Sequence, residues 1–272
     1  MPMTAAWGAP QRRVTPPREI LRAIRPGPIF FGLIVAAGIG VWLVASSETG
    51  RNAESIGGTL LLVLAGWVIS LCLHEFAHAV MAFRFGDHNA ELRGYLTLNP
   101  LRYTHPGLSL LLPLLIILMG GIGFPGGAVY VNQAGFTRVQ RTVVSLAGPL
   151  TNAVLGALLL AVIRVVGPSS NASFNLWAAL AMLAFLQITA AVLNILPVPG
   201  FDGYGAIEPY LSDQTRASMA KIAPYGFLIV FALLFIPALN RAFFDLIYRL
   251  FELSGVPAAL SSYGWQLFAF WT

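Results

Sequence analysis

The sequence predicts an all-α membrane protein with a bundle of about six transmembrane helices, and three observations support that prediction. Of its 272 residues, 57% are hydrophobic and only 10% are charged, whereas a soluble domain has about 25% charged residues. The hydrophobic residues gather in blocks long enough to cross a bilayer. Only short polar segments separate these blocks. The composition therefore argues against a soluble enzyme, a disordered chain, a coiled coil and a nucleic-acid-binding domain.

The first 27 residues form a basic tail that we expect to be cytoplasmic and mostly disordered. Its acidic residue is Glu19, and its arginines are Arg12, Arg13, Arg18, Arg22 and Arg25. The tail thus carries +4 of the net charge of +5. Arginines that flank a first hydrophobic segment favour the cytoplasmic side of the membrane.

Strong apolar blocks predict the transmembrane helices in order along the chain. They are about Ile29–Ala45, Gly57–Phe83, Val143–Val166, Phe174–Leu196 and Ile222–Ile236, with a continuation past Pro237 to Leu250 left open. Residues 28–250 are therefore expected to form the transmembrane domain. Residues 251–272 are expected to form an amphipathic or interfacial tail, because Trp265 and Trp271 suit the headgroup region.

A less regular region separates the second and third strong blocks. The apolar run Leu108–Ile122 leads into the glycine-rich run Gly120–Gly127 and the strand-like run Ala128–Asn132. This pattern predicts a re-entrant or short β segment. The run Ala128–Asn132 could also pair with an extended substrate as an added strand. The number of crossings in this region stays open.

The second predicted span carries the motif His74-Glu75-Phe76-Ala77-His78. Residues four apart share one helix face, so both histidines can bind one metal ion. Glu75 is turned about 100° around the helix and can reach a metal-bound water without binding the metal. The spacing H-E-x-x-H on a helix is typical of zinc hydrolases. A carboxylate-type charge inside a membrane costs about 2.5–3.5 kcal/mol, so a bound metal is the simplest partner for this cluster.

A catalytic zinc ion takes three protein ligands, so the chain must supply one more. The other histidines, His88 and His105, lie in a polar stretch and are expected to be loop or surface residues. The acidic candidates are Asp87, Glu91, Asp202, Glu208 and Asp213. Asp202 stands out because two prolines and a glycine end the preceding apolar helix and place this aspartate at a turn.

Over about Leu71–Leu211 the chain resembles the site-2 protease family of intramembrane zinc metalloproteases. Four motifs carry the resemblance: the His-Glu-Phe-Ala-His run, the stretch Gly94–Pro100, the run Gly148-Pro149-Leu150-Thr151-Asn152, and the element from Asn194 to Asp202-Gly203. The first and last motifs, in this order and on apolar helices, are specific. The chain departs from the pattern at Tyr103-Thr104-His105-Pro106, where relatives often read His-Ile-Asp-Pro.

The resemblance implies one Zn²⁺ ion held by His74, His78 and Asp202, with Glu75 as general base. It also places Asn194 near the scissile carbonyl. The residues alone leave Asn194 equally open to a role as a helix cap or an interhelical contact. For Asn152 they favour close helix packing with a polar contact.

The charges provide a check on topology. With a cytoplasmic N-terminus, the second span runs inward and brings His78 toward the cytoplasmic side. Asp202 can join the same zinc ion only if the span before it also runs inward. The third strong span then runs outward, and Arg138 and Arg141 at its start are cytoplasmic, as the positive-inside bias requires.

We therefore expect an intramembrane zinc endopeptidase that hydrolyses peptide bonds within or near the transmembrane segments of membrane protein substrates. The partners are a transmembrane protein substrate and the lipid bilayer, with no nucleic acid. Two alternatives stay open: a membrane metal or ion transporter, and a non-catalytic relative that keeps the same His and Asp site. The sequence leaves the oligomeric state and the substrate unnamed.

Overall fold

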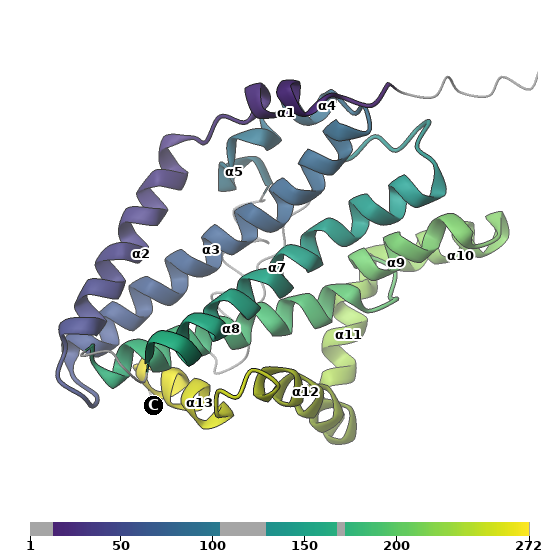
Figure 1. Ribbon diagram of the computed structural model, residues 1–272. Helices are drawn as coiled ribbons and strands as arrows, with labels where there is room; N and C mark the ends of the chain where they lie inside the picture. The colour runs from purple at the N-terminus through teal and green to yellow at the C-terminus, as the bar shows by residue number, and fades with distance from the viewer. Residues whose placement is uncertain (1–12, 104–128, 168–171, 272) are drawn as a thin grey trace, which may run out of the picture.

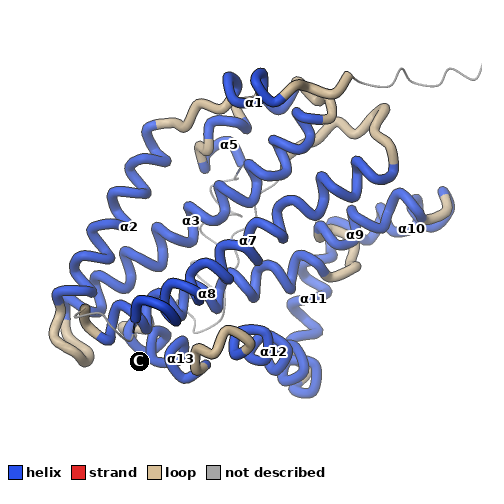
Figure 2. The backbone as a smooth tube through the Cα atoms, viewed as in Figure 1, coloured by secondary structure: helices blue, strands red, loops and turns tan. Residues whose placement is uncertain are grey.

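The computed structural model describes residues 13–103, 129–167 and 172–271. In this described part the chain is helical and contains no strand (Figure 2). The predicted all-α class is therefore confirmed. Four long helices run side by side as the body of the bundle: α2 (Pro28–Ser46), α3 (Ala53–Arg84), α7 (Arg138–Val166) and α8 (Phe174–Ile195) (Figure 1).

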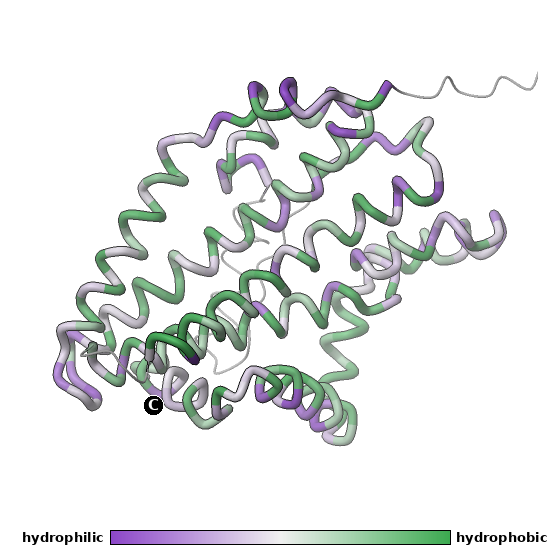
Figure 3. Tube along the Cα trace, viewed as in Figure 1, coloured by the Kyte–Doolittle hydropathy of each residue, from purple (hydrophilic) through white to green (hydrophobic). Residues whose placement is uncertain are grey.

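Five helical segments of the described chain are long and apolar enough to cross a membrane. Four of them are the long helices, and apolar residues run along their length (Figure 3). The fifth is Asp213–Leu234, which consists of α10 (Asp213–Ile222), η5 (Ala223–Tyr225) and α11 (Gly226–Leu234). The predicted membrane-spanning bundle is thus present, while the count of about six stays a prediction.

The predicted re-entrant or short β segment around residues 108–133 lies mostly outside the described residues. Its described end, residues 129–133, is neither helix nor strand. Residues 129–133 line the cavity of the site described below, although they have no regular secondary structure.

Helix α8 lies at the centre of the bundle and α2 lies at its edge. In the most apolar stretch of α8, 72% of the residues are buried, against 17% for α2. The fully buried Asn175 fastens the start of α8 to the turn between α2 and α3. Its Nδ2 atom lies 3.1, 2.9 and 3.1 Å from Ser47 Oγ, the Glu48 carbonyl oxygen and the Gly50 carbonyl oxygen.

Helices α3 and α7 each begin with a reciprocal capping box. Asn52 and Ser55 cap α3, and Thr137 and Gln140 cap α7, each side chain accepting from the backbone N–H of the other residue. The 32 residues of α3 extend about 48 Å at 1.5 Å per residue. Because the hydrocarbon core is about 30 Å thick, α3 projects beyond it.

The helix directions agree with the predicted parity. The backbone N–H of Ser173 donates to the Ala45 carbonyl oxygen at 3.1 Å, so α8 starts where α2 ends. At the opposite end of the bundle, α3 ends, α7 begins and α8 leads into α9 (Asp202–Ile207) (Figure 1). Asp202 and His78 therefore lie toward the same end of the molecule.

The N-terminal segment is more ordered than expected. Residues 17–23 form α1 (Pro17–Ala23). The N–H of Thr15 donates to the Arg84 carbonyl oxygen at 2.8 Å, and the N–H of Gly27 donates to the Thr97 carbonyl oxygen at 2.8 Å. The expectation of disorder is wrong for residues 13–27, because backbone hydrogen bonds hold them against the end of α3 and against Leu96 and Thr97. Short helices cover the same end: α4 (Asn89–Leu92), η1 (Tyr95–Thr97) and α5 (Pro100–Tyr103).

The apolar block after Ile222 does not continue as one helix to Leu250. Helix α11 ends at Leu234, and a separate α12 (Pro237–Glu252) begins at Pro237. Proline has no N–H to donate and suits the first position of a helix. The short η4 (Glu208–Tyr210) lies earlier, between α9 and α10. The last helix described, α13 (Ala258–Phe268), follows α12 and packs on α8. The domain limits at residues 28 and 251 stay predictions.

Candidate metal centre

The motif residues of α3 are buried within the bundle. His74, Glu75 and His78 have exposed fractions of 7%, 3% and 6%. At 3.6 residues per turn the two histidines project from the same helix face. Their ring centroids lie 4.8 Å apart in an edge-to-face arrangement. The helix therefore presents two imidazoles to one point.

Asp202 reaches these histidines because the chain turns sharply after α8. Gly200 has φ +100°, a left-handed conformation that favours glycine. At Gly203 a Cβ atom would lie 1.9 Å from the Ile195 carbonyl oxygen. Only glycine at 203 lets the first turn of α9 lie against the end of α8. Asp202 thus supplies a carboxylate, and Gly203 allows α9 to approach α8 closely enough for that carboxylate to reach the histidines.

The three candidate ligands are spaced as zinc requires. The two Nε2 atoms of His74 and His78 lie 3.1 Å apart. Asp202 Oδ2 lies 3.2 Å from His74 Nε2, and Asp202 Oδ1 lies 3.4 Å from His78 Nε2. Tetrahedral ligands with bonds of about 2.0–2.1 Å to zinc are about 3.3 Å from one another. Two imidazole nitrogens and a carboxylate oxygen are also a donor set of catalytic zinc sites, so these residues fit the ion.

In the neutral imidazole of His78, the hydrogen bonding leaves Nε2, the nitrogen that faces Asp202, free of a proton. Its Nδ1 atom lies 2.7 Å from the Val144 carbonyl oxygen, which can only accept. Nδ1 therefore carries the proton and Nε2 keeps its lone pair. Burial alone would raise the pKa of the Asp202 carboxyl, but the attraction of the adjacent imidazoles outweighs it and holds that pKa below its usual range. Asp202 is thus ionised, as an oxygen ligand to a metal must be.

Gly148 of α7 leaves space at the centre of this cluster. A Cβ atom there would lie 2.3 Å from His78 Nε2 and 2.5 Å from His74 Nε2. Any larger residue would occupy the volume into which the ligand nitrogens point. The glycine of the Gly-Pro-x-x-Asn run therefore has a steric role at the site.

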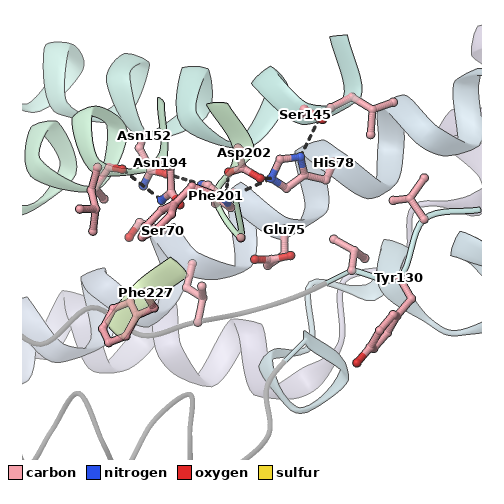
Figure 4. A pocket seen from close by; sticks show the side chains of 18 of the residues that line it. Ser70, Glu75, His78, Tyr130, Ser145, Asn152, Asn194, Phe201, Asp202 and Phe227 are labelled. Atoms are coloured by element: carbon pink, nitrogen blue, oxygen red, sulfur yellow. Dashed lines mark hydrogen bonds and ion pairs between the residues drawn. The ribbon is translucent and has the colours of Figure 1, made fainter. Parts of the chain in front are cut away.

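Glu75 lies beside the ligand cluster without belonging to it. The group of potential ligands found among the described residues contains His74, His78 and Asp202. Glu75 faces a cavity of about 870 Å³ that all three ligands also line (Figure 4). The backbone of Val129 lies close to the Glu75 carboxylate. The carboxylate is therefore held at the cavity wall, next to the metal position.

The irregular segment 129–133 forms one wall of this cavity. Asp87, only 1% exposed, accepts a hydrogen bond at Oδ2 from the Asn132 N–H at 2.8 Å. Tyr130 is 73% exposed and lies 5.8 Å from the Arg93 guanidinium. The segment is thus anchored to the turn that follows α3, while the side chain of Tyr130 is exposed.

The two asparagines of the motifs have different surroundings. Asn194 lines the cavity near Asp202 and Phe201, and its Nδ2 atom donates to the Ala190 carbonyl oxygen of its own helix at 3.1 Å (Figure 4). Asn152 does more than pack against a neighbouring helix, because its Oδ1 atom lies 2.5 Å from His74 Nδ1. The sequence did not indicate this contact with a candidate metal ligand.

The other candidate ligands do not join the cluster. His88 stacks edge-to-face on Phe83 at a centroid distance of 5.1 Å, as expected of a loop residue. His105 lies outside the described residues. In the described part of the chain, the ligand group does not include the other acidic candidates: Asp87, Glu91, Glu208 and Asp213.

Together, the apolar helices and the His-His-Asp cluster define a membrane protein with a zinc site of the hydrolase type. No family profile matches the chain, and no solved structure matches it. Three relatives have names that describe them as candidate zinc metalloproteases. Rip2 of Mycolicibacterium smegmatis is 52% identical over 94% of this chain and 98% of its own length. Rip2 of Mycobacterium tuberculosis H37Rv is 48% identical over 92% and 96%. YwhC of Bacillus subtilis is 35% identical over 64% and 79%. The chain belongs to the site-2 protease family of zinc metalloproteases.

Proposed function

We propose that this protein is an intramembrane zinc endopeptidase that cleaves membrane protein substrates within or near their transmembrane segments. The observation that carries the proposal is the spacing of the ligand atoms of His74, His78 and Asp202 at 3.1 to 3.4 Å, with Glu75 at the same cavity. A hydrolytic site of this kind on a membrane-spanning helix suits a substrate that is itself in the membrane.

The chain's own residues divide the work of peptide hydrolysis. His74, His78 and Asp202 would hold one Zn²⁺ ion, which when bound lowers the pKa of water and polarises a carbonyl group. The carboxylate of Glu75 takes a proton from the attacking water and passes it to the leaving amine nitrogen. Its burial beside the ligands shields that proton from bulk solvent.

Asn194 is proposed to stabilise the substrate carbonyl oxygen as negative charge develops on it. Its side chain lines the same cavity as Glu75, and one of the two Nδ2 hydrogens is used by the Ala190 carbonyl. The second hydrogen is available to a substrate oxygen. A comparable side-chain donor contributes about 2.7–4 kcal/mol in other hydrolases.

We also propose that the N-terminus is cytoplasmic and that the site faces the cytoplasmic side. Arg18, Arg22 and Arg25 lie at or next to α1, at the end of the bundle where α3 ends. Such arginines favour the cytoplasm. Cys72 is the one cysteine of the chain and is buried. An Arg18→Cys variant therefore offers a single accessible thiol, and a membrane-impermeant thiol reagent should label it only in inverted vesicles.

The deciding experiment compares the wild type with Glu75→Gln, which keeps the shape of the side chain but cannot accept the proton. We expect Glu75→Gln to retain zinc in one-to-one ratio and to lose cleavage of a synthetic transmembrane peptide by a factor of about 10²–10⁴. Glu54→Gln is the matched control, since Glu54 lies exposed in the first turn of the same helix.

Two results would count against the proposal. Unchanged cleavage by Glu75→Gln would exclude this residue as the base. Absence of zinc from the wild-type protein would exclude the metal site. Zinc transport into vesicles without peptide cleavage would instead support the transporter alternative.

A further inference from the structure

A chain of buried side chains connects three helices to one of the proposed zinc ligands. It begins on α3, where the Ser70 hydroxyl donates to the Trp67 carbonyl oxygen at 2.8 Å. Gln187 of α8 donates from Nε2 to Ser70 Oγ at 2.9 Å. Asn152 of α7 donates from Nδ2 to Gln187 Oε1 at 2.7 Å and meets His74 Nδ1 with Oδ1. This series of hydrogen bonds thus starts on α3 at Trp67 and ends on the same helix at His74.

The members of this chain are screened from solvent. Ser70, Asn152 and Gln187 have exposed fractions of 4%, 4% and 1%. A buried amide must satisfy both its donor and its acceptor, so its orientation follows from its neighbours. Gln187 lies in the apolar core of α8, where a glutamine with no partner would be unfavourable.

The direction of every hydrogen bond follows from the first one. A backbone carbonyl can only accept, so the Ser70 proton points to Trp67 and Ser70 Oγ is left to accept from Gln187. Gln187 therefore turns its amide nitrogen to Ser70 and its oxygen to Asn152. Asn152 in turn directs its nitrogen to Gln187 and its oxygen to His74.

This direction determines which nitrogen of His74 carries the proton. Facing an oxygen, Nδ1 must be the donor, and Nε2 is left with a lone pair toward His78 and Asp202. If the amides were reversed, Asn152 would offer an N–H to Nδ1, and the proton would sit on Nε2. His74 could not then bind a metal. His78 needs no such device because it donates directly to the Val144 carbonyl.

We propose that Gln187 is a positioning residue for the metal site, which fixes the tautomer and ring orientation of His74 through Asn152. The inference rests on the proposed zinc site. It assigns to Gln187 a role in zinc affinity even though its side chain touches neither the ion nor the substrate.

The test measures zinc affinity by competition with a chelator on the purified full chain in detergent. Gln187→Met removes both ends of the amide at similar length. We expect its zinc Kd to rise about tenfold or more, within the 10–100-fold range that outer partners of zinc ligands show. Gln187→Glu retains an acceptor for Asn152 Nδ2 and should lose less affinity than Gln187→Met.

The control is a second buried amide of the same helix. Asn175→Leu breaks the hydrogen bonds at the far end of α8, so it should lower the unfolding temperature without changing the zinc Kd. Ser70→Ala is a milder variant, which removes only the hydroxyl that orients Gln187, and it serves if Gln187→Met fails to fold. It too should weaken zinc binding.

The outcomes separate the inference from the function on which it rests. Wild-type zinc affinity in Gln187→Met, or in Ser70→Ala if that is the variant that folds, would overturn the proposal while leaving the zinc site intact. Equal loss of affinity in Gln187→Met and Asn175→Leu would show general loosening and would also overturn it. A wild-type protein that binds no zinc would refute the metal centre itself, and Gln187 would then have no ion to serve.

Discussion

Replacement of Gly148 by alanine tests the geometry of the proposed metal centre most directly. The added methyl carbon would lie 2.3 Å from His78 Nε2 and 2.5 Å from His74 Nε2. Favourable contact needs about 3.5 Å, so the imidazoles or α7 must move by about 1 Å. Zinc bond lengths tolerate deviations of only about 0.2 Å. We therefore expect Gly148→Ala to lose stoichiometric zinc and all cleavage.

The assay combines zinc content, cleavage of a transmembrane peptide and thermal unfolding of the purified chain. Overpacking in the bundle should destabilise Gly148→Ala by about 1–3 kcal/mol. A loss of stability of this size would not by itself explain a complete loss of bound zinc. Gly57→Ala is the control, because a Cβ atom at this helical position of α3 meets nothing within 4 Å. Wild-type zinc affinity in Gly148→Ala would show that α7 does not lie against the histidines as described.

Further expected outcomes concern the cavity wall, the substrate donor and the metal. Asp87→Ala frees the Asn132 N–H, so peptide cleavage should fall while zinc content stays at the wild-type level; unchanged cleavage would contradict a role for the anchor. Asn194→Ala should lower kcat by about 10²–10³ with zinc retained, and a change confined to KM would instead indicate substrate binding alone. Removal of zinc with a chelator should lower the unfolding temperature reversibly. Zinc affinity should fall as the pH is lowered, because protons compete for imidazole nitrogen and carboxylate oxygen; constant affinity between about pH 8 and pH 5 would exclude these ligands.

The site was predictable from the sequence where its chemistry depends on local spacing. One helical turn brings His74 and His78 together in any α-helix, so their spacing alone indicated a shared metal. Asp202 was harder, since its place depends on how α8 ends. The prolines and glycines after Ile195 indicated a turn but not its direction. The structure brings the aspartate to the histidines, and its role as a ligand remains a proposal.

The contacts that support the ligands could not be predicted in this way. A lone glutamine in an apolar helix signals that a polar partner exists, but Gln187 lies far along the chain from Ser70 and Asn152. Their meeting depends on the rotation of three helices about their axes. The same limit applies to residues 13–27, where a proline- and arginine-rich composition suggested disorder. Backbone hydrogen bonds to Arg84 and Thr97 hold that segment in place. Such long-range hydrogen bonds cannot be inferred from amino-acid composition.

The distribution of the three proposed zinc ligands along the chain has a consequence for biosynthesis. Both histidines belong to α3, whereas the aspartate begins α9, after α7 and α8. Chains are made from the N-terminus, so α3 enters the membrane well before Asp202 leaves the ribosome. During that interval the histidine pair lacks its third ligand, and a catalytic zinc site requires three. On the proposed ligand set, a nascent chain would therefore be unable to hydrolyse peptide bonds until Asp202 has been made and α9 has folded against the histidines.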